Sequence, residues 1–458
     1  MKIIILGAGQ VGSNVAASLS REENDITVVD LDQGKLAELQ DKLDIRGIIG
    51  NASHPRVLTR AGAEDADMIV AVTNSDEINM IACQVAYTIF QTPTKIARVR
   101  AAEYLDYPEL FRGEHCPVDV LISPERLVTE HVQRLIEYPG AAQVLDFADG
   151  RAQLVAIEIS SSSALAARKI RELKDILPTG IEIRVAAIFR SDRQIIPDAD
   201  TRIELRDTVF FLAARRDIRT VMAELRRLEP AVRRIILAGG GNIGSNLALA
   251  IEDRYHVKIL ERHHDRAREI AEELEKTIVL KGDATDENLL REENIDQTDV
   301  FCALTNDDEA NILSSMLARR LGARKVISLV NRAAYVDMIE SGTIDIAVSP
   351  QQVTIGALLT HVRRGHMVRV HSLRRGAAEA IEAVAHGDAA SSKVVGRTIE
   401  DIELPEGATI GGIVRGDQLI IAHHDTVVES EDHVILFVVD KDCIGTIERL
   451  FQVGVTFM

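Results

Sequence analysis

Short hydrophobic runs alternate with longer amphipathic segments through the first 123 residues of the chain. Each run is brief, rich in β-branched residues and bounded by polar residues or glycine, which is typical of a buried strand. The runs predict strands at Ile3–Leu6, Ile26–Val29, Arg46–Ile49, Met68–Val72, Lys95–Val99 and Val120–Ile122. Strands that alternate with helix-length segments predict a parallel sheet with helices on both faces.

The same pattern returns at residues 232–350. The motif Gly-Asn-Ala-Ser at 50–53 recurs as Gly-Asp-Ala-Thr at 282–285, and Thr-Asn-Ser-Asp-Glu-Ile-Asn at 73–79 recurs as Thr-Asn-Asp-Asp-Glu-Ala-Asn at 305–311. Both repeats are offset by 232 residues. We therefore expect a duplicated domain, with residues 1–123 and 232–350 forming two Rossmann-like, doubly wound α/β domains.

A Ser-Pro pair follows each of these domains, at Ser123-Pro124 and Ser349-Pro350. Serine is a favoured N-cap and proline suits the first helical position, so each pair predicts the start of a helix. The helices carry one apolar face each, at Leu127, Val128, His131 and Leu135 and at Ile355, Leu358, Leu359 and Val362. Because a completed sheet has no face left to cover, we expect both apolar stripes to pack on another domain.

Two small α+β domains are expected at residues 140–228 and 366–453. The first has predicted strands at Gln153–Ile159, Ile181–Ile188, Gln194–Ile196 and Val209–Leu212, with helices near Ala164–Lys174 and at Asp217–Leu228. The second has predicted strands at His366–His371, Ala408–Val414, Gln418–Ala422 and His433–Val438, with helices near Thr398–Ile402 and at Asp442–Leu450. Charge and Pro230 at 226–234 predict a short exposed linker between the halves.

A Gly-x-Gly-x-x-Gly motif follows the first predicted strand of each large domain. Its glycines are Gly7, Gly9 and Gly12, and then Gly239, Gly241 and Gly244. The first glycine of such a motif makes a tight turn, the second lets the backbone approach a pyrophosphate, and the third lets the helix pack on the strand. Backbone N–H groups and the helix dipole then meet the phosphate charge.

An acidic residue ends the second predicted strand of each large domain. Asp30 lies eighteen residues after Gly12, and Glu261 lies seventeen after Gly244. From this spacing a carboxylate can accept hydrogen bonds from a ribose diol. Because it would repel a 2′-phosphate, NAD(H) is favoured over NADP(H).

Short polar residues follow the fourth predicted strand of each copy, Thr73 and Asn74 in the first and Thr305 and Asn306 in the second. The carboxyl ends of parallel strands are where ligands bind in such sheets, so these side chains are candidates for bonds to ribose or adenine. An N-cap at Asn74 or Ser75 is an equally good reading of the first pair.

Net charge and cysteine content limit the partners, cellular compartment and metal sites that we expect for this chain. A formal net charge of -18 argues against a nucleic acid, because phosphate backbones need a basic face. The four cysteines lie far apart without a Cys-x-x-Cys pair, which fits a reducing cytosol and no zinc cluster. No apolar run approaches the roughly 18 residues that span a bilayer, so we expect any membrane role to be played from outside the bilayer, through a partner.

This arrangement resembles the potassium-conductance regulator (RCK) family of cytosolic domains over essentially the whole chain. The resemblance rests on the two glycine loops, the Thr-Asn-x-Asp-Glu-x-x-Asn blocks, the Ser-Pro helices and the duplication. It implies a regulator without catalytic residues that binds NAD(H), with ATP and ADP as further candidates. It also implies a homo-oligomeric, tetrameric ring that gates a potassium-translocating membrane subunit.

The resemblance assigns a set of nucleotide-binding residues to each half of the chain. In the first half these are Gly7, Ala8, Gly9, Gln10, Val11, Gly12, Asp30, Thr73, Asn74 and Arg98. In the second half they are Gly239, Gly240, Gly241, Asn242, Ile243, Gly244, Glu261, Thr305, Asn306 and Asn331. On this assignment Arg98 and Asn331 occupy equivalent places, so we expect the two sites to differ in nucleotide preference.

Two other classes of protein use the same fingerprint. An NAD-dependent oxidoreductase would need a proton donor with an orienting carboxylate near the nicotinamide, and the scattered histidines offer none. It would also have no use for two nucleotide domains in one subunit. A redox-sensing DNA-binding repressor is disfavoured by the acidity and by the lack of a basic recognition helix.

Overall fold

The computed structural model describes residues 1–20, 24–111, 115–161, 163–190, 193–225, 231–332, 335–336, 344–362, 367–373, 377–440 and 443–453. Of the predicted linker at 226–234, residues 226–230 lie outside these ranges. The chain divides into two compact units. One is Met1–Leu127 with Gln351–Arg363, and the other is Val128–Pro350 with Arg364–Met458.

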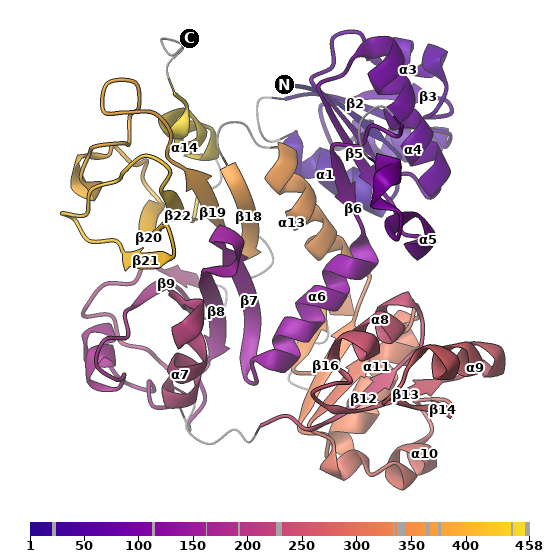
Figure 1. The fold of residues 1–458 in the computed structure, drawn as a ribbon, viewed down its shortest axis with the longest axis vertical. Coiled ribbons are helices and arrows are strands. Elements are labelled where there is room, and N and C mark those ends of the chain that lie inside the picture. Colours follow the sequence, from indigo (N-terminus) through magenta and orange to yellow (C-terminus); the bar gives the residue numbers. More distant parts are fainter. Residues whose placement is uncertain are drawn as a thin grey trace. The chain divides into compact units, whose positions relative to one another are not determined.

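The first unit is built on a parallel sheet of six strands in the order β3-β2-β1-β4-β5-β6 (Figure 1). The strands are β1 (Lys2–Leu6), β2 (Asp25–Asp30), β3 (Arg46–Ile49), β4 (Met68–Ala71), β5 (Thr94–Arg98) and β6 (Val120–Ile122). The helices are α1 (Gln10–Leu19), α2 (Gln33–Gln40), α3 (Pro55–Ala61), α4 (Asp76–Val85), the π-helical turn η1 (Ala86–Phe90), α5 (Ala102–Leu105) and the 3-10 turn η2 (Pro108–Phe111). All six predicted strands are confirmed to within two residues at their ends.

Alternate residues of β1 enter different cores, as the period of a strand requires. Ile3 and Ile5 join the layer formed with α1 and α2, whereas Ile4 and Leu6 join the layer formed with α3 and α4. The sheet order reverses between β1 and β4, so the loops after these two strands meet at the switch point where ligands bind in open α/β sheets.

The second unit contains the duplicate sheet, in the order β14-β13-β12-β15-β16-β17. Its strands are β12 (Arg234–Ala238), β13 (His256–Glu261), β14 (Ile278–Lys281), β15 (Val300–Ala303), β16 (Lys325–Leu329) and β17 (Ile346–Val348). Its helices are α8 (Asn242–Ile251), α9 (His264–Glu273), α10 (Glu287–Glu292), the 3-10 turn η5 (Ile295–Gln297) and α11 (Asp308–Arg320). The fold class predicted for residues 232–350 is therefore confirmed.

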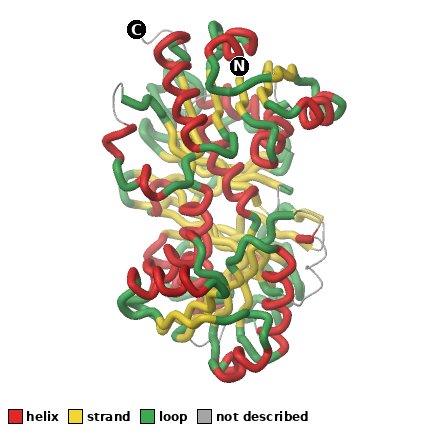
Figure 2. Tube along the Cα trace, turned by 90° about the vertical axis from the view of Figure 1, so that its right-hand side faces the viewer, coloured by secondary structure: helices red, strands yellow, loops and turns green. Residues whose placement is uncertain are grey.

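Two antiparallel sheets of five strands complete the second unit, with orders β10-β9-β11-β8-β7 and β18-β19-β22-β20-β21. The first has β7 (Ala141–Phe147), β8 (Ala152–Glu158), β9 (Ile183–Arg190), β10 (Arg193–Ile195), β11 (Thr208–Ala214), the 3-10 turns η3 (Ala148–Gly150) and η4 (Ile170–Asp175), and α7 (Arg215–Leu225). The second has β18 (Met367–Leu373), β19 (Ala378–Val384), β20 (Ala408–Arg415), β21 (Gln418–Ile421), β22 (His433–Val438), the 3-10 turn η7 (Ile399–Asp401) and α14 (Ile444–Phe451). Figure 2 shows the same chain with its helices in red and its strands in yellow.

Three details of the small domains differ from the prediction. Strands β7 and β19 have no counterpart in it, and the helices expected near 164–174 and 398–402 are short 3-10 turns. The sequence of β19, AEAIEAV, is rich in alanine and glutamate, which favour helices, yet every residue of the strand is buried. Tertiary burial therefore overrides local propensity in this strand.

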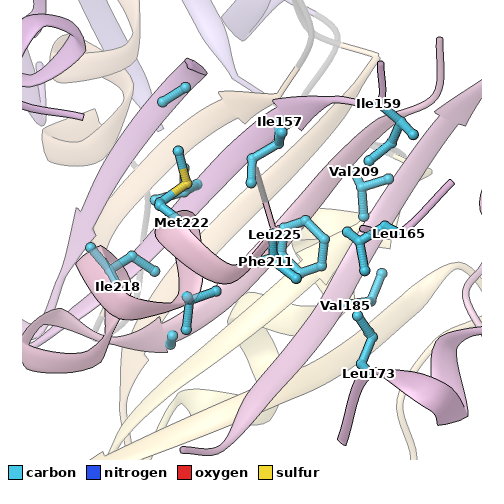
Figure 3. Close-up of a cluster of buried hydrophobic side chains, with 14 of the residues drawn as sticks. Ile157, Ile159, Leu165, Leu173, Val185, Val209, Phe211, Ile218, Met222 and Leu225 are labelled. Atoms are coloured by element: carbon cyan, nitrogen blue, oxygen red, sulfur yellow. The ribbon is translucent and has the colours of Figure 1, made fainter. Parts of the chain in front are cut away.

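The small sheets have apolar residues on both faces. One face of the first is covered by α7, where Ile218, Met222 and Leu225 pack on strand residues such as Phe211 (Figure 3). The other face packs on the second small sheet through a shared core that includes Phe189, Phe210 and Phe437. The two small domains thus share one apolar core.

The helices that follow the Ser-Pro pairs, α6 (Pro124–Glu137) and α13 (Pro350–Val362), pack on domains other than their own. In the first unit, Ile355 and Leu358 of α13 join the core of the first large sheet. In the second unit, Glu137 of α6 accepts a 2.7 Å hydrogen bond from Arg254 of the second large domain. The expected packing of the apolar stripe on another domain is confirmed for α13 at Ile355 and Leu358. For α6 the contact of Glu137 with another domain is polar, whereas Leu127 packs against the core of its own large domain. The side chains of Leu359 and Val362 lie outside the described residues.

Among the residues that the structure describes, no helix is long and apolar enough to cross a membrane.

Candidate functional site

The three glycines of the first loop each meet a different structural requirement. Gly7 has a φ of +108°, which favours glycine, and a β-carbon built there would lie 3.1 Å from the backbone of Thr73. A β-carbon on Gly12 would lie 1.9 Å from the carbonyl oxygen of Gly7, so only glycine lets α1 approach the strand. At Gly9 no atom lies within 4 Å of the built β-carbon. The loop therefore leaves open space where its second glycine faces outward.

The second loop repeats this geometry. Gly239 has a φ of +105°, Gly241 faces open space, and a β-carbon on Gly244 would lie 2.0 Å from the carbonyl oxygen of Gly239. In both copies the second glycine is the N-cap of a ten-residue helix, and its carbonyl accepts from Ser13 in α1 or Ser245 in α8. N–H groups at a helix start point away from the helix and attract anions, so each loop is a candidate phosphate cradle.

The strand-end carboxylates hold the glycine loops in place. Asp30 accepts from the N–H of Ala8 at 2.6 Å through one oxygen and from the N–H of Asp32 at 2.8 Å through the other. Glu261 accepts from the N–H groups of Gly240 and His263 at 2.8 Å in the same way. The extra methylene of Glu261 thus leaves the pattern unchanged. Each carboxylate oxygen keeps a lone pair for a ribose hydroxyl.

Thr73 is fixed by a buried asparagine that the sequence reading left without a role. The Asn79 amide oxygen accepts from the N–H and the hydroxyl of Thr73 at 2.9 and 2.7 Å, and its NH₂ donates to the carbonyl of Arg98 at 2.9 Å. Asn311 holds Thr305 with equivalent bonds in the second copy. The N-cap of α4 is Ser75, whose hydroxyl accepts from the N–H of Ile78, so the capping role falls on Ser75 and not on Asn74.

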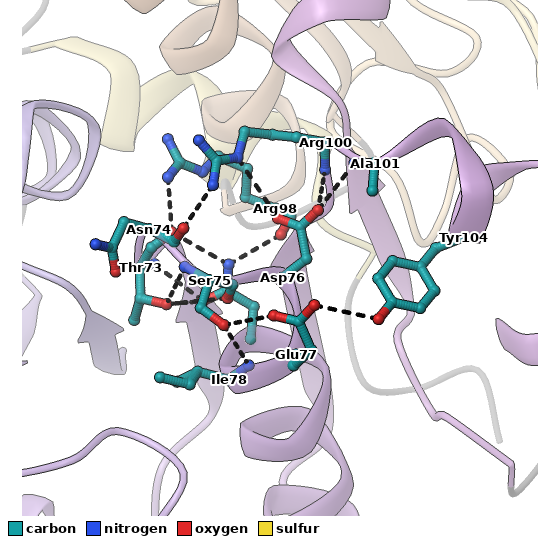
Figure 4. A network of polar contacts seen from close by, with 11 residues as sticks. Thr73, Asn74, Ser75, Asp76, Glu77, Ile78, Arg98, Arg100, Ala101 and Tyr104 are labelled. Atoms are coloured by element: carbon teal, nitrogen blue, oxygen red, sulfur yellow. Dashed lines mark hydrogen bonds and ion pairs between the residues drawn. The ribbon is translucent and has the colours of Figure 1, made fainter.

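Arginines and acids gather beyond Thr73 in the first site (Figure 4). Arg98 donates to the carbonyl of Thr73 at 2.6 Å, and Arg100 donates to the carbonyl of Asn74. One oxygen of Asp76 accepts from the N–H groups of Arg100 and Ala101 at 2.8 and 2.9 Å. The carboxylate of Asp76 therefore fixes the turn that carries the arginines over the switch point.

Several polar atoms of this cluster are buried without a hydrogen-bond partner among the described residues. They are Nε of Arg98, Oε2 of Glu125, and Oδ1 of Asp76 with Nε of Arg100, which face each other as an ion pair at 3.6 Å. Burial lowers the pKa of Arg98 and raises the pKa of Glu125. Unmet buried donors and acceptors are costly, so a polar ligand that supplies their partners fits here. The open cradle at Gly9 and these atoms together fit a nucleotide with its phosphates on α1.

The structure corrects one predicted equivalence between the copies. Asn79 and Asn311 donate to the carbonyls of Arg98 and Leu329, so Leu329 is the counterpart of Arg98. Asn331 is the counterpart of Arg100, because its N–H bonds Asp308 as that of Arg100 bonds Asp76. The reason is local: the π-helical turn η1 extends the end of α4 and shifts the offset from 232 to 231 before β5.

The second site also differs at its rim. Leu31, directly after Asp30, is 69% exposed, and the residue directly after Glu261 is Arg262. Arg266 of α9 donates to the carbonyl of Gly240 at 3.0 Å, beside the glycine loop. The second site thus has Arg262 and Arg266 at its rim. At its switch point it has Arg332, paired with Glu309 at 3.0 Å, in place of the Arg98 and Arg100 of the first site.

The first glycine loop also contacts α13, which belongs to the same unit. The side chain of Gln351 hydrogen bonds to Gln10, and it accepts from Asn14 at 3.3 Å. A change in the position of α1 therefore alters contacts at the start of α13.

Two observations concern metal-binding and nucleophilic side chains among the described residues. They contain no group of three histidine, cysteine, aspartate or glutamate residues that could hold a metal ion. Burial raises the pKa of Cys302 to about 12 and raises the pKa of Cys83, so both thiols stay protonated and unreactive.

Comparison with known proteins agrees with this architecture. The TrkA-N domain model matches residues 3–124 and 235–350, and the TrkA-C domain model matches residues 154–226 and 388–452. The GsuK channel bound to NAD shares the fold with a TM-score of 0.61 at 18% identity, covering 98% of this chain and 78% of that one. The GsuK RCK domain matches with the same TM-score and identity over 98% of this chain and 94% of that one.

Curated relatives match from end to end. The Trk system potassium uptake protein TrkA of Halomonas elongata is 62% identical over 457 residues, and that of Vibrio alginolyticus is 57% identical over 459, each covering 100% of both chains. On the strength of both domain models and these relatives, the chain belongs to the family of Trk system potassium uptake proteins TrkA.

Proposed function

We propose that this chain is a nucleotide-sensing regulatory subunit that controls potassium uptake by a membrane partner. The observation that carries the proposal is the 62% identity, over the full length of both chains, to a Trk system potassium uptake protein. The duplicated phosphate cradle supplies the sensor, since both loops keep open space at the second glycine. The partner would be a TrkH- or TrkG-like potassium-translocating subunit.

We infer that NAD(H) binds both glycine loops, with ATP and ADP as further candidates. The first site would use the loop 7–12 with Asp30, Thr73, Asn74 and Arg98. The second would use the loop 239–244 with Glu261, Thr305, Asn306 and Asn331. Support comes from the strand-end carboxylates, which suit a ribose diol, and from the unmet buried atoms of the first site. Bound nucleotide would supply only binding energy, without chemical change.

The sensing mechanism rests on differential affinity. A nucleotide shifts an equilibrium between two arrangements only by the difference in its affinity for them. The hydrogen bonds between Gln10, Asn14 and Gln351 offer one such difference, because they link the phosphate cradle to α13. Residues 1–123 and 232–350 would act as nucleotide domains, and residues 140–228 and 366–453 as the small domains of a tetrameric ring on the cytosolic face of the membrane.

Potassium uptake is the direct test. Cells that lack their own regulator would carry the wild-type chain, Asp30→Ala or Glu261→Ala, with expression checked by immunoblot. We expect reduced or dysregulated uptake with each variant and weaker NAD binding in calorimetric titration. Normal uptake by a variant that no longer binds nucleotide would contradict the proposal. Steady consumption of NADH with a small metabolite would instead support an oxidoreductase.

A further inference from the structure

A cavity of about 800 Å³ lies in the second unit, and no residue of either glycine loop lines it. Its walls come from α6, from the first small domain around η3 and α7, from Arg254 after α8, and from Asp417 in the turn after β20. This volume falls within the range of small-molecule sites. An occupant of the cavity would therefore touch three domains at once.

Arginine dominates the lining. Six arginines face the cavity against four carboxylates, so the lining carries a formal charge of +2 on a chain whose net charge is -18. The arginines are Arg134, Arg151, Arg215, Arg216, Arg219 and Arg254. A local excess of positive charge on an acidic protein marks a place where an anion is attracted, not simply tolerated.

The paired and unpaired charges lie on different walls. On the α6 wall, Arg134 meets Asp146 at 3.0 Å and Arg254 meets Glu137 at 2.7 Å, so these carboxylates are neutralised by arginines. On the α7 wall, Arg215 and Arg219 have no ion pair within the described part of the chain. The uncompensated charge is therefore concentrated at the start of α7, where the helix dipole adds to it.

Two further residues shape the cavity. Gly150 has a φ of +83°, which favours glycine, and a β-carbon built there would lie 2.7 Å from a guanidinium nitrogen of Arg215, so the Arg215 side chain lies close to the backbone of Gly150. Gln153, which is 2% exposed, donates to Asp146 at 2.8 Å, and its amide oxygen is buried without a partner among the described residues. A hydroxyl group on a bound solute would supply the missing donor.

From these observations we propose that the cavity binds a small organic phosphate, with its phosphates on Arg215, Arg219 and the start of α7. Guanidinium groups bind phosphate oxygens through two parallel hydrogen bonds, and unpaired arginines are free to do so. The buried acceptor of Gln153 favours a phosphate that also carries a hydroxyl over a simple inorganic ion. The site is separate from the nucleotide loops and does not depend on their function.

Inorganic pyrophosphate is a suitable probe of the phosphate contacts, which do not involve Gln153, provided that the glycine loops are blocked. Calorimetric titration would use the full chain carrying Gly9→Asp and Gly241→Asp, so that only the cavity remains to bind it. In this background R215Q/R219Q is compared with the control R268Q/R291Q, which removes the same charge from exposed ion pairs elsewhere. We expect about 100-fold weaker binding in R215Q/R219Q, because each charged hydrogen bond is worth roughly one order of magnitude.

The control should bind pyrophosphate as the parent does. R219E alone provides a milder variant, since Arg219 is exposed and its change leaves Gly150 and Arg215 in place. Equal binding by R215Q/R219Q and the control would overturn the proposal. So would citrate binding as tightly as pyrophosphate at matched ionic strength, or a change of oligomeric state in R215Q/R219Q without any change in pyrophosphate affinity.

Discussion

At Gly9 a substitution can be expected to change ligand binding without changing folding. Its φ of -75° and ψ of -176° are open to any residue, and a β-carbon there would meet no atom within 4 Å. It is also the N-cap of α1, a position that aspartate and asparagine favour. Gly9→Asp should therefore fold normally while placing a negative charge where the pyrophosphate is expected.

The loss of affinity follows from the charge. Two unit charges of the same sign, 4 Å apart near a protein surface, repel by about 4 kcal/mol. This energy corresponds to roughly a 1000-fold larger dissociation constant. Gly9→Asn has the same size and capping ability without the charge, so the difference between the two variants isolates repulsion from crowding. Gly12→Ala is the opposite case: its β-carbon would lie 1.9 Å from the Gly7 oxygen, and we expect a loss of stability of about 1–3 kcal/mol.

Calorimetric titration with NAD and thermal unfolding test this reasoning together. We expect Gly9→Asp to lose the first of two binding events, with an unfolding temperature equal to or above that of the parent. Gly9→Asn should keep that event with a smaller loss of affinity. The reasoning fails if Gly9→Asp binds two equivalents as tightly as the parent, or if Gly9→Asn loses as much affinity as Gly9→Asp.

Three further predictions concern buried polar groups. Asn79→Ala should destabilise the first nucleotide domain by about 1–3 kcal/mol in urea unfolding, because a buried N–H and carbonyl lose their partner. Asp207→Ala should lower the free energy of unfolding by about 3–5 kcal/mol in the same assay. It removes a fully buried carboxylate that accepts hydrogen bonds from Arg190 at 2.9 and 3.0 Å. Burial lowers the pKa of His131 and of His371 to about 4, below the unfolded value, so stability should fall as pH drops from about 6.5 towards 4. Each histidine contributes up to about 3 kcal/mol to that loss, and His131→Gln should flatten the profile of unfolding against pH.

Short-range sequence patterns predicted those strands and turns that are determined by residues close together in the sequence. The strands of the large domains could be predicted from short apolar runs, and Gly7 and Gly12 have the turn and packing roles that their places in the motif imply. Strand β19 could not be read in this way, because its AEAIEAV sequence favours a helix and only burial makes it a strand. The failure lies where packing between distant segments decides the structure.

The hydrogen-bond partners of side chains at the edge of the sheet could not be predicted from the sequence either. The offset between the copies is 232 residues at the glycine loops and from residue 50 to Asn79, although it is 231 at Asp30 and Glu261. The π-helical turn η1 adds one residue to the first copy before β5, where the offset is again 231. The sequence reading aligned Arg98 with Asn331, an offset of 233, whereas the hydrogen bonds align it with Leu329, an offset of 231. An irregular helix end leaves no clear signal in composition or periodicity, so only the backbone contacts reveal it.

The corrected alignment separates what the duplication kept from what it changed. The asparagines that fix Thr73 and Thr305 make equivalent bonds in both copies, and both strand-end carboxylates hold their loops by matching N–H groups. The exchanged positions lie at the switch point and the rim, where Arg98 becomes Leu329 and Leu31 becomes Arg262. Because the loop-fixing contacts are equal while the charges around them differ, the two cradles should bind phosphate alike and discriminate between nucleotides by what lies beyond it.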